Sequence, residues 1–313
     1  MNMQVRELRV LEEKWDYLII LDACRYDYFE KYYKFFLPGE LEKRRTPASN
    51  TPRWRDANFP DYYEDVVYIS ASPMMSTEGE VYGYNAKDHF RHIHEVWKEL
   101  WDNNLGTVAP IPLVNKALEI IGDYSGKKFI IHLLQPHAPY IFSGVRGYSS
   151  GDLSGKRKML ESENYSENKF LRRFFEKNKF KLRKLIRGHN QPDWVLRKIL
   201  GLAPSGAMEA MWRKGGTQTL RNEYEKNLIA ALASVRIFAE KAEGETLVIA
   251  DHGELLGENG MYGHPEDSGS EILMNVPCLK INSKELKKEG DSSQAEEDDQ
   301  QTVADKLGQL GYM

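Results

Sequence analysis

The segment from Thr246 to His264 contains residues whose types and spacing suit the binding of a metal ion. An apolar run, 247–250, ends directly at Asp251 and His252, and a glycine-rich loop follows. Such a run predicts a strand that is buried on both faces, as in the centre of a parallel sheet. Ligands of these sheets bind at the carboxyl ends of the strands, where Asp251 and His252 would lie. A carboxylate beside an imidazole suits a divalent cation such as zinc or manganese.

An isolated Asp-His-Gly also has a simpler interpretation, in which the aspartate caps a helix and the histidine is a hydrogen-bonded core residue. A metal site therefore requires further ligands elsewhere in the chain. Asp22 is one candidate, because it follows Tyr17–Leu21, a second apolar run that predicts a buried strand. A helix N-cap is the alternative for Asp22 as well.

A candidate nucleophile, Thr51, precedes Pro52 in a loop that is rich in small hydroxyl residues. Proline favours the first turn of a helix, so the Thr51 hydroxyl is expected at the positive end of a helix dipole. This position can hold an anionic ester, and a threonine oxygen bound to a metal is acidic enough to attack phosphorus. A plain Ser/Thr helix cap is the alternative.

His137 follows the predicted strand that begins at Lys128, and it lies between Pro136 and Pro139. The two prolines restrict the backbone, so the imidazole would be presented from a stiff loop at the end of the sheet. His132 lies inside the strand and is predicted to be a hydrogen-bonded core residue. We select His137 as the functional histidine of this segment.

In their order along the chain, these segments resemble the alkaline phosphatase superfamily, in its sulfatase-like branch. The resemblance rests on Asp22, the Thr51 loop, the Gln-Pro-His-Ala-Pro-Tyr segment 135–140 and the Asp-His-Gly-Glu block 251–264. It implies an α/β fold, a three-layer α/β/α sandwich with a mostly parallel central sheet. It implies a metal site whose ligands are Asp22, Thr51, Asp251 and His252. It further implies that His137 and His264 contact the ester or its leaving group.

The nucleophile loop departs from the formylglycine sulfatases, which carry Cys or Ser followed by x-Pro-x-Arg. Here the loop is Asn50-Thr51-Pro52-Arg53, and threonine cannot become formylglycine. A threonine nucleophile and a histidine at 264 resemble the phosphoethanolamine and phosphoglycerol transferases. Ser49 is the alternative nucleophile, because a shift of the alignment would exchange it with Thr51.

The resemblance predicts a metal-dependent hydrolase or transferase that acts on phosphate mono- or diesters through Thr51. A sulfatase that works without formylglycine and a non-catalytic binding protein that keeps the fold are the alternatives. Zinc or manganese is the expected ion, with calcium or magnesium as further options. Only His137 and His264 are obvious ligands for a second ion. The substrate would be a phosphorylated, less readily a sulfated, small-molecule, lipid-linked or glycan compound.

The 313 residues are expected to form one sulfatase-like α/β domain, 1–313. Residues 143–221 are predicted to form a basic helical insertion or lid, because 155–188 contains twelve Lys/Arg against four Glu with interleaved aromatics. Peripheral contact with a membrane through 168–188 is one expectation, and packing of the apolar side onto the main domain is the other. Residues 283–301 are predicted to be an acidic linker before a short helix, 302–310.

Composition narrows the class of protein. A hydrophobic content of 41%, a charged content of 29% and a net charge of −4 describe a globular protein without an expected nucleic-acid partner. The N-terminal residues lack the apolar core of a signal peptide, and Cys24 and Cys278 form no disulfide framework. These features predict a cytoplasmic location, with or without peripheral membrane contact. The sequence sets no oligomeric state.

The remaining elements follow from hydrophobic periodicity. Further expected elements are a strand at Asp65–Ala71, an edge strand at Ile272–Ile281, and helices at Ala23–Phe36, Lys87–Trp101, Ile111–Ile121 and Leu220–Ala242. His89 and His92 would be solvated on the second of these helices. Arg25, just beyond Asp22, could contact a phosphate oxygen, but a structural pairing with Asp27 or Glu30 is the preferred expectation.

Overall fold

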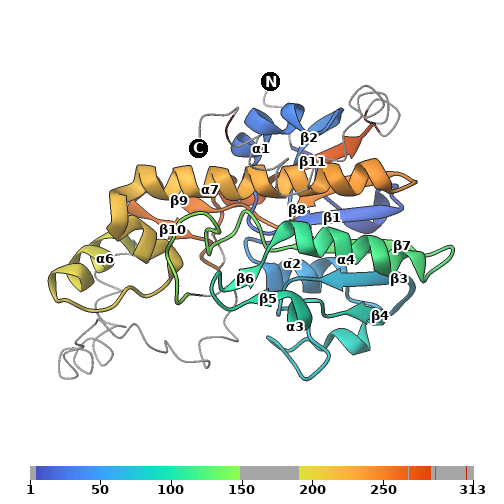
Figure 1. Ribbon diagram of the computed structural model, residues 1–313, viewed down its shortest axis with the longest axis horizontal. Coiled ribbons are helices and arrows are strands. Elements are labelled where there is room, and N and C mark those ends of the chain that lie inside the picture. Colours follow the sequence, from blue (N-terminus) through green and yellow to red (C-terminus); the bar gives the residue numbers. More distant parts are fainter. Residues whose placement is uncertain (1–4, 149–189, 267, 283–285, 287–307, 309–313) are drawn as a thin grey trace.

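The computed structural model describes residues 5–148, 190–266, 268–282, 286 and 308. Figure 1 shows a central sheet with helices on both sides. The strands of this sheet are β1 (Tyr17–Leu21), β2 (Gly39–Arg45), β3 (Tyr63–Ser70), β4 (Phe90–His94), β7 (Lys128–Leu133), β8 (Thr246–Ala250) and β11 (Asn275–Ile281). Two short pairs lie outside it, β5 (Trp101–Asp102) with β6 (Thr107–Val108) and β9 (Leu255–Leu256) with β10 (Tyr262–Gly263).

Seven α-helices occur in the described part of the chain. They are α1 (Tyr26–Tyr32), α2 (Thr51–Asn58), α3 (Trp97–Leu100), α4 (Pro110–Gly122), α6 (Asn190–Ile199), α7 (Ala207–Lys241) and α8 (Glu271–Met274). Short 3-10 turns are η1 (Val10–Glu12), η2 (Tyr33–Phe35), η3 (Ala86–Asp88) and η5 (Glu258–Gly260). The long α7 is kinked at Gly215 and Gly216, whose backbone angles are not helical.

The strand order is β2-β11-β8-β1-β7-β3-β4. β1 is parallel to both of its neighbours, β7 and β8, and β3 is parallel to β4 and β7. Only β11 runs antiparallel to the two strands beside it, β2 and β8. The predicted fold class, an α/β sandwich with a mostly parallel sheet, is confirmed.

Aromatic contacts identify the helix that covers each face of the sheet. Tyr17 of β1 stacks on Phe129 of β7 at 5.7 Å between ring centroids and meets Phe238 of α7 edge-on at 5.4 Å. His132 lies three residues after Phe129 on β7, so it points to the opposite face, where it contacts Trp54 of α2. Figure 1 shows α4 beside α7 on the first face. The sheet is therefore the middle of three layers.

Burial on both faces explains why the central strands are continuously apolar. All five residues of β1 and all five of β8 are buried. Each large aliphatic side chain buried in this way stabilises the fold by roughly 1.5–3 kcal/mol. The two strands that deliver the predicted metal ligands are thus among the most firmly packed parts of the molecule.

The edge of the sheet differs from the prediction. The strand expected at 272–281 is β11, and it lies inside the sheet because β2 covers its outer side. The sequence pattern did not reveal β2, which reads Gly-Glu-Leu-Glu-Lys-Arg-Arg and is mostly charged. Charged residues are a common feature of edge strands, because they discourage pairing with another chain.

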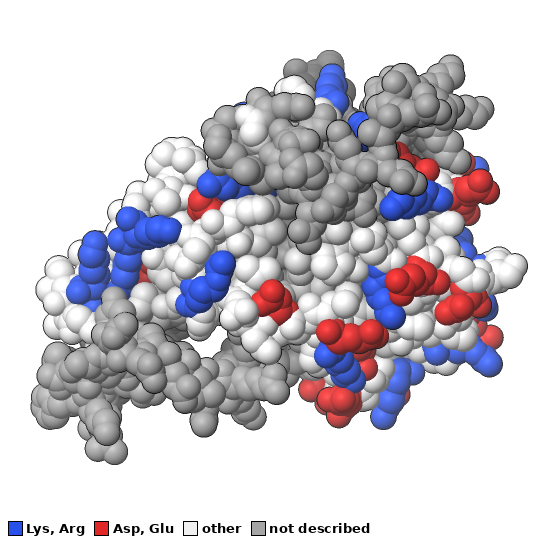
Figure 2. Space-filling model, in the orientation of Figure 1, with Lys and Arg blue, Asp and Glu red and all other residues white. Residues whose placement is uncertain are grey.

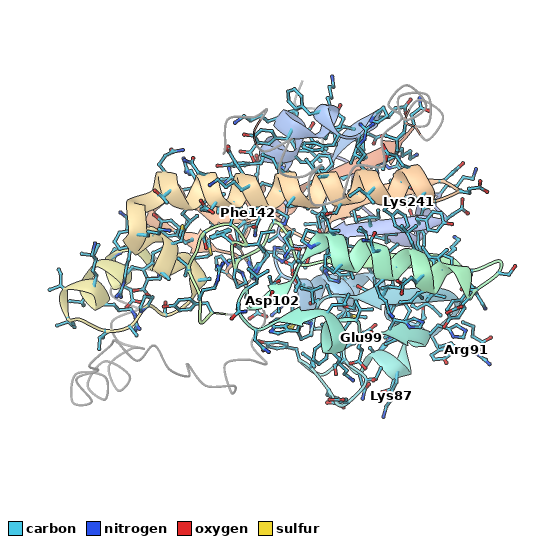
Figure 3. The ribbon with its side chains drawn as sticks, viewed as in Figure 1. Lys87, Arg91, Glu99, Asp102, Phe142 and Lys241 are labelled. Carbon is cyan, nitrogen blue, oxygen red and sulfur yellow. The ribbon has the colours of Figure 1, made fainter. Side chains whose placement is uncertain are left out.

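The predicted helix Lys87–Trp101 is wrong. This segment contains η3, the strand β4 and the short helix α3, and β4 pairs in parallel with β3. Sheet pairing therefore overrides a pattern that also fits a helix. His89 stacks on Tyr84 at 3.8 Å between ring centroids, and His92 packs against Tyr124. Figure 3 shows Lys87 and Arg91 pointing outward from this end of the molecule.

Several predicted regions lie largely outside the described residues. These are the basic part of the insertion, including 168–188, and the linker and helix at 283–310 apart from Leu286 and Gly308. The described part of the insertion contains α6 and the first turns of α7. Among the described residues, no helix combines the length and the apolar character that a membrane crossing requires.

Charges of both signs are interspersed on the described part of the face in Figure 2. Toward the lower right of that view, acidic and basic side chains are neighbours. Among the ion pairs of the described residues, Lys98 pairs with Glu78 and Glu95 at 2.8 Å each. Lys116 contacts Glu99 at 3.5 Å in the same way. This mixture differs from the basic stripe that is typical of nucleic-acid binders.

An ion-pair cluster holds the loop after β8 against the start of α1. Arg25 is buried, and its guanidinium donates to Asp27 and to Glu258, each at 2.7 Å, and to the backbone carbonyl of Glu254 at 3.3 Å. Arg221 of α7 contacts the same Glu258 oxygen at 3.1 Å. The predicted pairing of Arg25 with Asp27 is confirmed, whereas its second carboxylate is Glu258 and not Glu30.

The ion pair with Arg25 gives a pH-dependent prediction. Burial alone would raise the pKa of Glu258, but the hydrogen bond and charge of Arg25 outweigh it and lower that pKa. The stabilisation is therefore complete above the ordinary carboxyl pKa of about 4.3 and disappears as the pH falls through the lower folded value. We expect Glu258→Gln to lose about 1 kcal/mol of unfolding free energy at pH 7, since the pair is partly exposed.

Urea unfolding at pH 7 and at acidic pH measures this difference. The difference between Glu258→Gln and the wild type should shrink as the pH is lowered below about 4. Glu119→Gln, which changes an exposed carboxylate on α4, is the control and should have little effect at either pH. A pH-independent loss would contradict the electrostatic explanation.

Candidate metal and ester site

Asp22 and Asp251 meet at the carboxyl edge of the sheet. The register pairs Leu21 of β1 with Ala250 of β8, and the next residue on each strand is an aspartate. Both side chains are buried, with 6% of Asp22 and none of Asp251 exposed. The parallel arrangement thus brings together two carboxylates that are 229 positions apart in the sequence.

The Asp251 carboxylate is held by backbone and side-chain donors. Oδ1 accepts hydrogen bonds from the backbone N–H groups of Ala23 at 3.0 Å and His252 at 2.8 Å. Oδ2 accepts the hydroxyl hydrogen bond of Thr51 at 2.7 Å. Because one oxygen is tied to the backbone, the other is fixed in the direction of Thr51.

Thr51 begins α2, as its position before Pro52 predicts. The side chain of Asn50 caps the helix by accepting from the backbone N–H of Arg53 at 3.0 Å. The Thr51 hydroxyl lies 3.3 Å from Nε2 of His252. Ser49, the alternative nucleophile, instead donates to the carbonyl of Pro265 at 3.1 Å. Of the two hydroxyls, that of Thr51 is the one within reach of Asp251 and His252.

His252 points Nε2 toward the two aspartates. Its Nδ1 contacts the carbonyl oxygen of Gly253 at 2.8 Å, which leaves Nε2 at 3.4 Å from Asp251 Oδ2 and 3.7 Å from Asp22 Oδ1. Gly253 is required because a Cβ there would overlap the backbone carbonyl of Ile272. The backbone N–H of Gly253 donates to the carbonyl of Leu273 at 2.8 Å.

The four residues fit a divalent cation on chemical grounds. They offer two carboxylates, a hydroxyl and an imidazole nitrogen, a donor set that zinc and manganese accept. Oδ1 of Asp22 is buried without a hydrogen-bond partner among the described residues. Burial and the nearby charges of Asp251 and Glu254 raise the pKa of Asp22 well above its ordinary value. A cation between these oxygens would remove both penalties.

A second group of side chains adjoins the first. His137, Glu254 and His264 place their ligand atoms within 4.8 Å of one another. Glu254 Oε1 accepts from Nδ1 of His264 at 3.1 Å, and Glu254 Oε2 lies 4.0 Å from Nε2 of His137. That Oε2 atom is buried without a partner in the described part of the chain. These three side chains have the composition to hold a second cation. Glu254 is thereby added to the two histidines that the sequence suggested as ligands of a second ion.

Sequence reasoning missed Glu254 as a site residue. It lies three residues after Asp251 in the same loop, and its exposure is 0%. The available signal was a carboxylate close to the Asp-His pair and followed by the apolar Leu-Leu, a pattern that indicates a buried acidic residue beside the site.

The two histidines of this group differ in protonation. Burial lowers the pKa of His137. Burial would do the same to His264, but the adjacent Glu254 carboxylate outweighs it and raises the pKa of His264. The His252 pKa is lowered well below its usual range by burial and by His264. The pKa of His264 is thus shifted upward and those of His137 and His252 downward, and His137 and His264 line the same pocket as Thr51.

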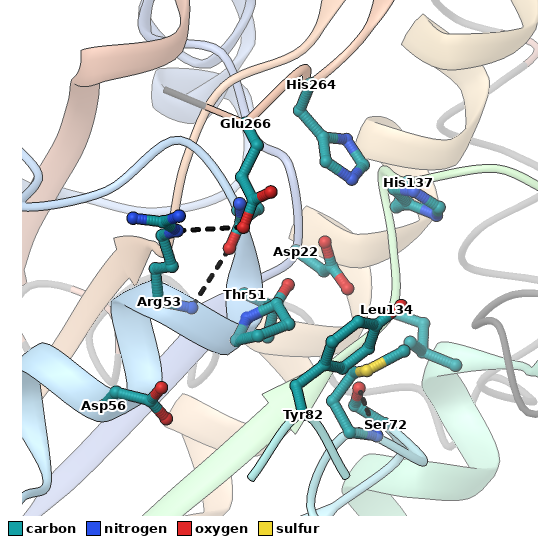
Figure 4. Close-up of a pocket in the computed structure, with 13 residues that line it drawn as sticks. Asp22, Thr51, Arg53, Asp56, Ser72, Tyr82, Leu134, His137, His264 and Glu266 are labelled. Atoms are coloured by element: carbon teal, nitrogen blue, oxygen red, sulfur yellow. Dashed lines mark hydrogen bonds and ion pairs between the residues drawn. The ribbon is translucent and has the colours of Figure 1, made fainter. Parts of the chain in front are cut away.

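These groups open into a pocket of about 840 Å³. Its lining includes Asp22, Thr51, His137 and His264, so the pocket is continuous with the candidate metal centre. Figure 4 shows the two histidines above Asp22 and Thr51. The outer wall contains Met74, Tyr82, Asp56 and the ion pair between Arg53 and Glu266, which are 2.9 Å apart. The volume is sufficient for a small ester with its alcohol group.

Solved structures of similar fold were found, whereas no family model and no curated protein matches the sequence. The integral membrane protein lipooligosaccharide phosphoethanolamine transferase A from Neisseria meningitidis is 14% identical, with 92% of this chain and 53% of that chain covered and a TM-score of 0.46. The C-terminal periplasmic domain of EptC from Escherichia coli, in complex with zinc, is 11% identical, with 87% and 73% covered and a TM-score of 0.45.

A candidate sulfatase from Bacteroides thetaiotaomicron is also 11% identical, with 86% of this chain and 64% of that chain covered and a TM-score of 0.44. The chain spans about half the length of the Neisseria meningitidis protein. The matched structures include phosphoethanolamine transferases and a candidate sulfatase, the kinds of enzyme that the sequence motifs resemble.

The predicted cytoplasmic location is wrong, because the similar structures include a periplasmic domain and an integral membrane protein. The prediction rested partly on two unpaired cysteines. Cys24 and Cys278 are both buried free thiols, so packing explains them without reference to the redox state of a compartment. We do not retain the cytoplasmic assignment.

The geometry predicts that Asp251→Asn abolishes tight metal binding without unfolding the protein. The amide preserves the shape of the side chain but removes one of the two charges that would attract a cation. The affinity for zinc or manganese, measured by chelator competition, should fall by more than the roughly 100-fold that outer-shell substitutions reach. Asp56→Asn on the outer pocket wall is the control and should bind metal as the wild type does. An Asp251→Asn protein with wild-type affinity would contradict the ligand assignment.

Proposed function

We propose that this protein is a metal-dependent hydrolase or transferase of phosphate esters in which Thr51 is the nucleophile. The observation that carries the proposal is the position of the Thr51 hydroxyl. It lies at the first residue of α2, 2.7 Å from Asp251 and 3.3 Å from His252, and it lines the pocket. A nucleophile needs an adjacent base or metal for activation, and Asp251 and His252 beside the hydroxyl are residues that could hold such a metal.

A divalent ion held by Asp22, Thr51, Asp251 and His252 would neutralise charge on the phosphoryl oxygens and acidify the Thr51 hydroxyl. Asp251 Oδ2 already accepts the hydrogen bond of that hydroxyl and so orients Thr51 Oγ1 for attack on phosphorus, while the proton of the hydroxyl passes to water in the pocket. The positive end of the α2 dipole favours the anionic ester at this position. The P–Oγ1 bond forms as the bond from phosphorus to the leaving alcohol breaks.

The two histidines divide the proton transfers between them. His264, whose pKa is raised by Glu254, is the protonated group and gives a proton to the leaving alcohol oxygen. His137, whose pKa is lowered by burial, is neutral and accepts a proton from the water or acceptor hydroxyl that resolves the phosphothreonine. The 5.2 Å between their ring centroids lets both reach one ester.

Zinc or manganese is the proposed ion, and the proposed substrate is a phosphorylated small molecule, lipid-linked compound or glycan. The aromatic ring of Tyr82 and the charged pair Arg53–Glu266 on the outer wall suit an alcohol that has both apolar and polar parts. A sulfatase remains the second candidate because the pocket would also admit a sulfate ester. It has weaker support, since Thr51 cannot provide the hydrated aldehyde of formylglycine sulfatases.

Turnover of p-nitrophenyl phosphate, bis-p-nitrophenyl phosphate and p-nitrophenyl sulfate tests the proposal. We expect cleavage of at least one phosphate ester with zinc or manganese and none with a chelator. Thr51→Ala should reduce that rate by at least about a thousand-fold, as expected when a covalent nucleophile is removed. Ser49→Ala is the matched control and should retain activity, because its hydroxyl faces Pro265.

Each alternative predicts a different result. Cleavage of the sulfate alone would overturn the phosphoryl assignment. Activity that survives in Thr51→Ala but is lost in Ser49→Ala would transfer the nucleophile role to Ser49. A protein that binds neither zinc nor manganese would favour a binding protein with this fold.

A further inference from the structure

His132 occupies a buried position directly beneath the candidate metal centre. It lies on β7, in register with Ile20 of β1, two residues before Asp22. Its side chain is completely buried, and its ring packs against that of Trp54 from α2 at 6.5 Å between centroids. The sequence predicts a hydrogen-bonded core histidine here, and one ring nitrogen fits that prediction, since Nδ1 lies 2.9 Å from the hydroxyl of Tyr68.

The other ring nitrogen does not fit a simple core role. Nε2 of His132 is buried and has no hydrogen-bond partner in the described part of the chain. The ligand atoms of His132, Asp22 and Asp251 all lie within 4.8 Å of one another. Oδ1 of Asp22 is likewise buried and unpaired. An unpaired buried polar atom costs roughly 1–3 kcal/mol, so two such atoms at one place indicate a shared partner.

We propose that His132 is an additional ligand of the metal ion, binding through Nε2 beside Asp22 and Asp251. The inference rests on the proposed metal centre and extends its ligand set from one imidazole to two. Tyr68 has the role of the outer partner, because its hydroxyl can accept the Nδ1–H hydrogen bond and leave the lone pair of Nε2 toward the ion. Tyr68 is itself fully buried on β3, so the pair is rigid.

The electrostatic environment agrees with this geometry. Burial lowers the pKa of His132 to about 4, so the ring is neutral at pH 7, as a metal-binding imidazole must be. A neutral ring also adds no positive charge that would repel a cation bound by the two carboxylates, Thr51 and His252.

A second imidazole has a consequence for the choice of metal. Nitrogen ligands favour zinc and cobalt over the hard cations calcium and magnesium, which prefer oxygen. A centre with His132 and His252 should therefore select zinc or cobalt. A centre with His252 alone would discriminate less against magnesium.

The experiment compares four full-length proteins loaded with zinc or Co²⁺: the wild type, His132→Leu, Tyr68→Phe and Trp54→Phe. Zinc affinity is measured by chelator competition, and the visible absorption of bound Co²⁺ reports its ligands. We expect His132→Leu to weaken zinc binding by at least about 100-fold and to alter the Co²⁺ spectrum. Tyr68→Phe should weaken binding by about 10-fold, as for an outer-shell partner. Trp54→Phe, which changes the packing against the His132 ring, should leave the zinc affinity and the Co²⁺ spectrum unchanged.

His132→Leu with wild-type affinity and an unchanged Co²⁺ spectrum would overturn the proposal and return His132 to the core. A weaker affinity with an unchanged spectrum would also overturn it, because His132 would then only position Asp22. If His132→Leu does not fold, long-range ¹H–¹⁵N NMR spectra of the wild type test the proposal instead. The Nε2 resonance of His132 must shift when zinc is added, and an unchanged resonance would overturn the proposal. A wild type that binds no metal would instead refute the proposed function.

Discussion

Two carboxylates buried side by side are the constraint on which the rest of the site depends. Asp22 and Asp251 follow adjacent parallel strands in register, so the fold itself forces them together. Burial, together with the like charges of Asp251 and Glu254, raises the pKa of Asp22 well above its ordinary value. The surrounding groups, Thr51, His252 and His132, leave donor atoms aimed at the same region. A divalent cation at this place would offset the repulsion between the carboxylates and bind these donor atoms.

The elements outside the site hold this arrangement in place. The strands β1 and β8 are buried throughout, which fixes the positions of their carboxyl ends. The Asn50 cap sets the start of α2 and therefore the direction of Thr51. Burial lowers the pKa of His137, whereas the hydrogen bond and charge of Glu254 outweigh burial and raise the pKa of His264. Both histidines line the same pocket as Thr51.

The sequence predicts those features that depend on local pattern. Apolar runs ending in aspartate identified β1 and β8, and a threonine before proline identified the start of α2. The prediction failed where pairing between distant strands determines the secondary structure, as it does for the charged β2 and for β4. The ligand roles assigned from the sequence to Asp22, Thr51, Asp251 and His252 stay predictions, although the structure brings these residues together. Periodicity indicates that His132 is buried, but only the register of β7 reveals that it faces the two aspartates.

The central claim is that one divalent cation is held between Asp22, Asp251, His252 and the Thr51 hydroxyl. Anomalous X-ray diffraction from crystals of the zinc-loaded protein, recorded on both sides of the zinc edge, tests it most directly. The account predicts a peak about 2.0–2.2 Å from the Asp22 and Asp251 oxygens and from Nε2 of His252. A zinc-loaded crystal with no peak between the two aspartates would contradict the account, as would a single peak confined to His137, Glu254 and His264.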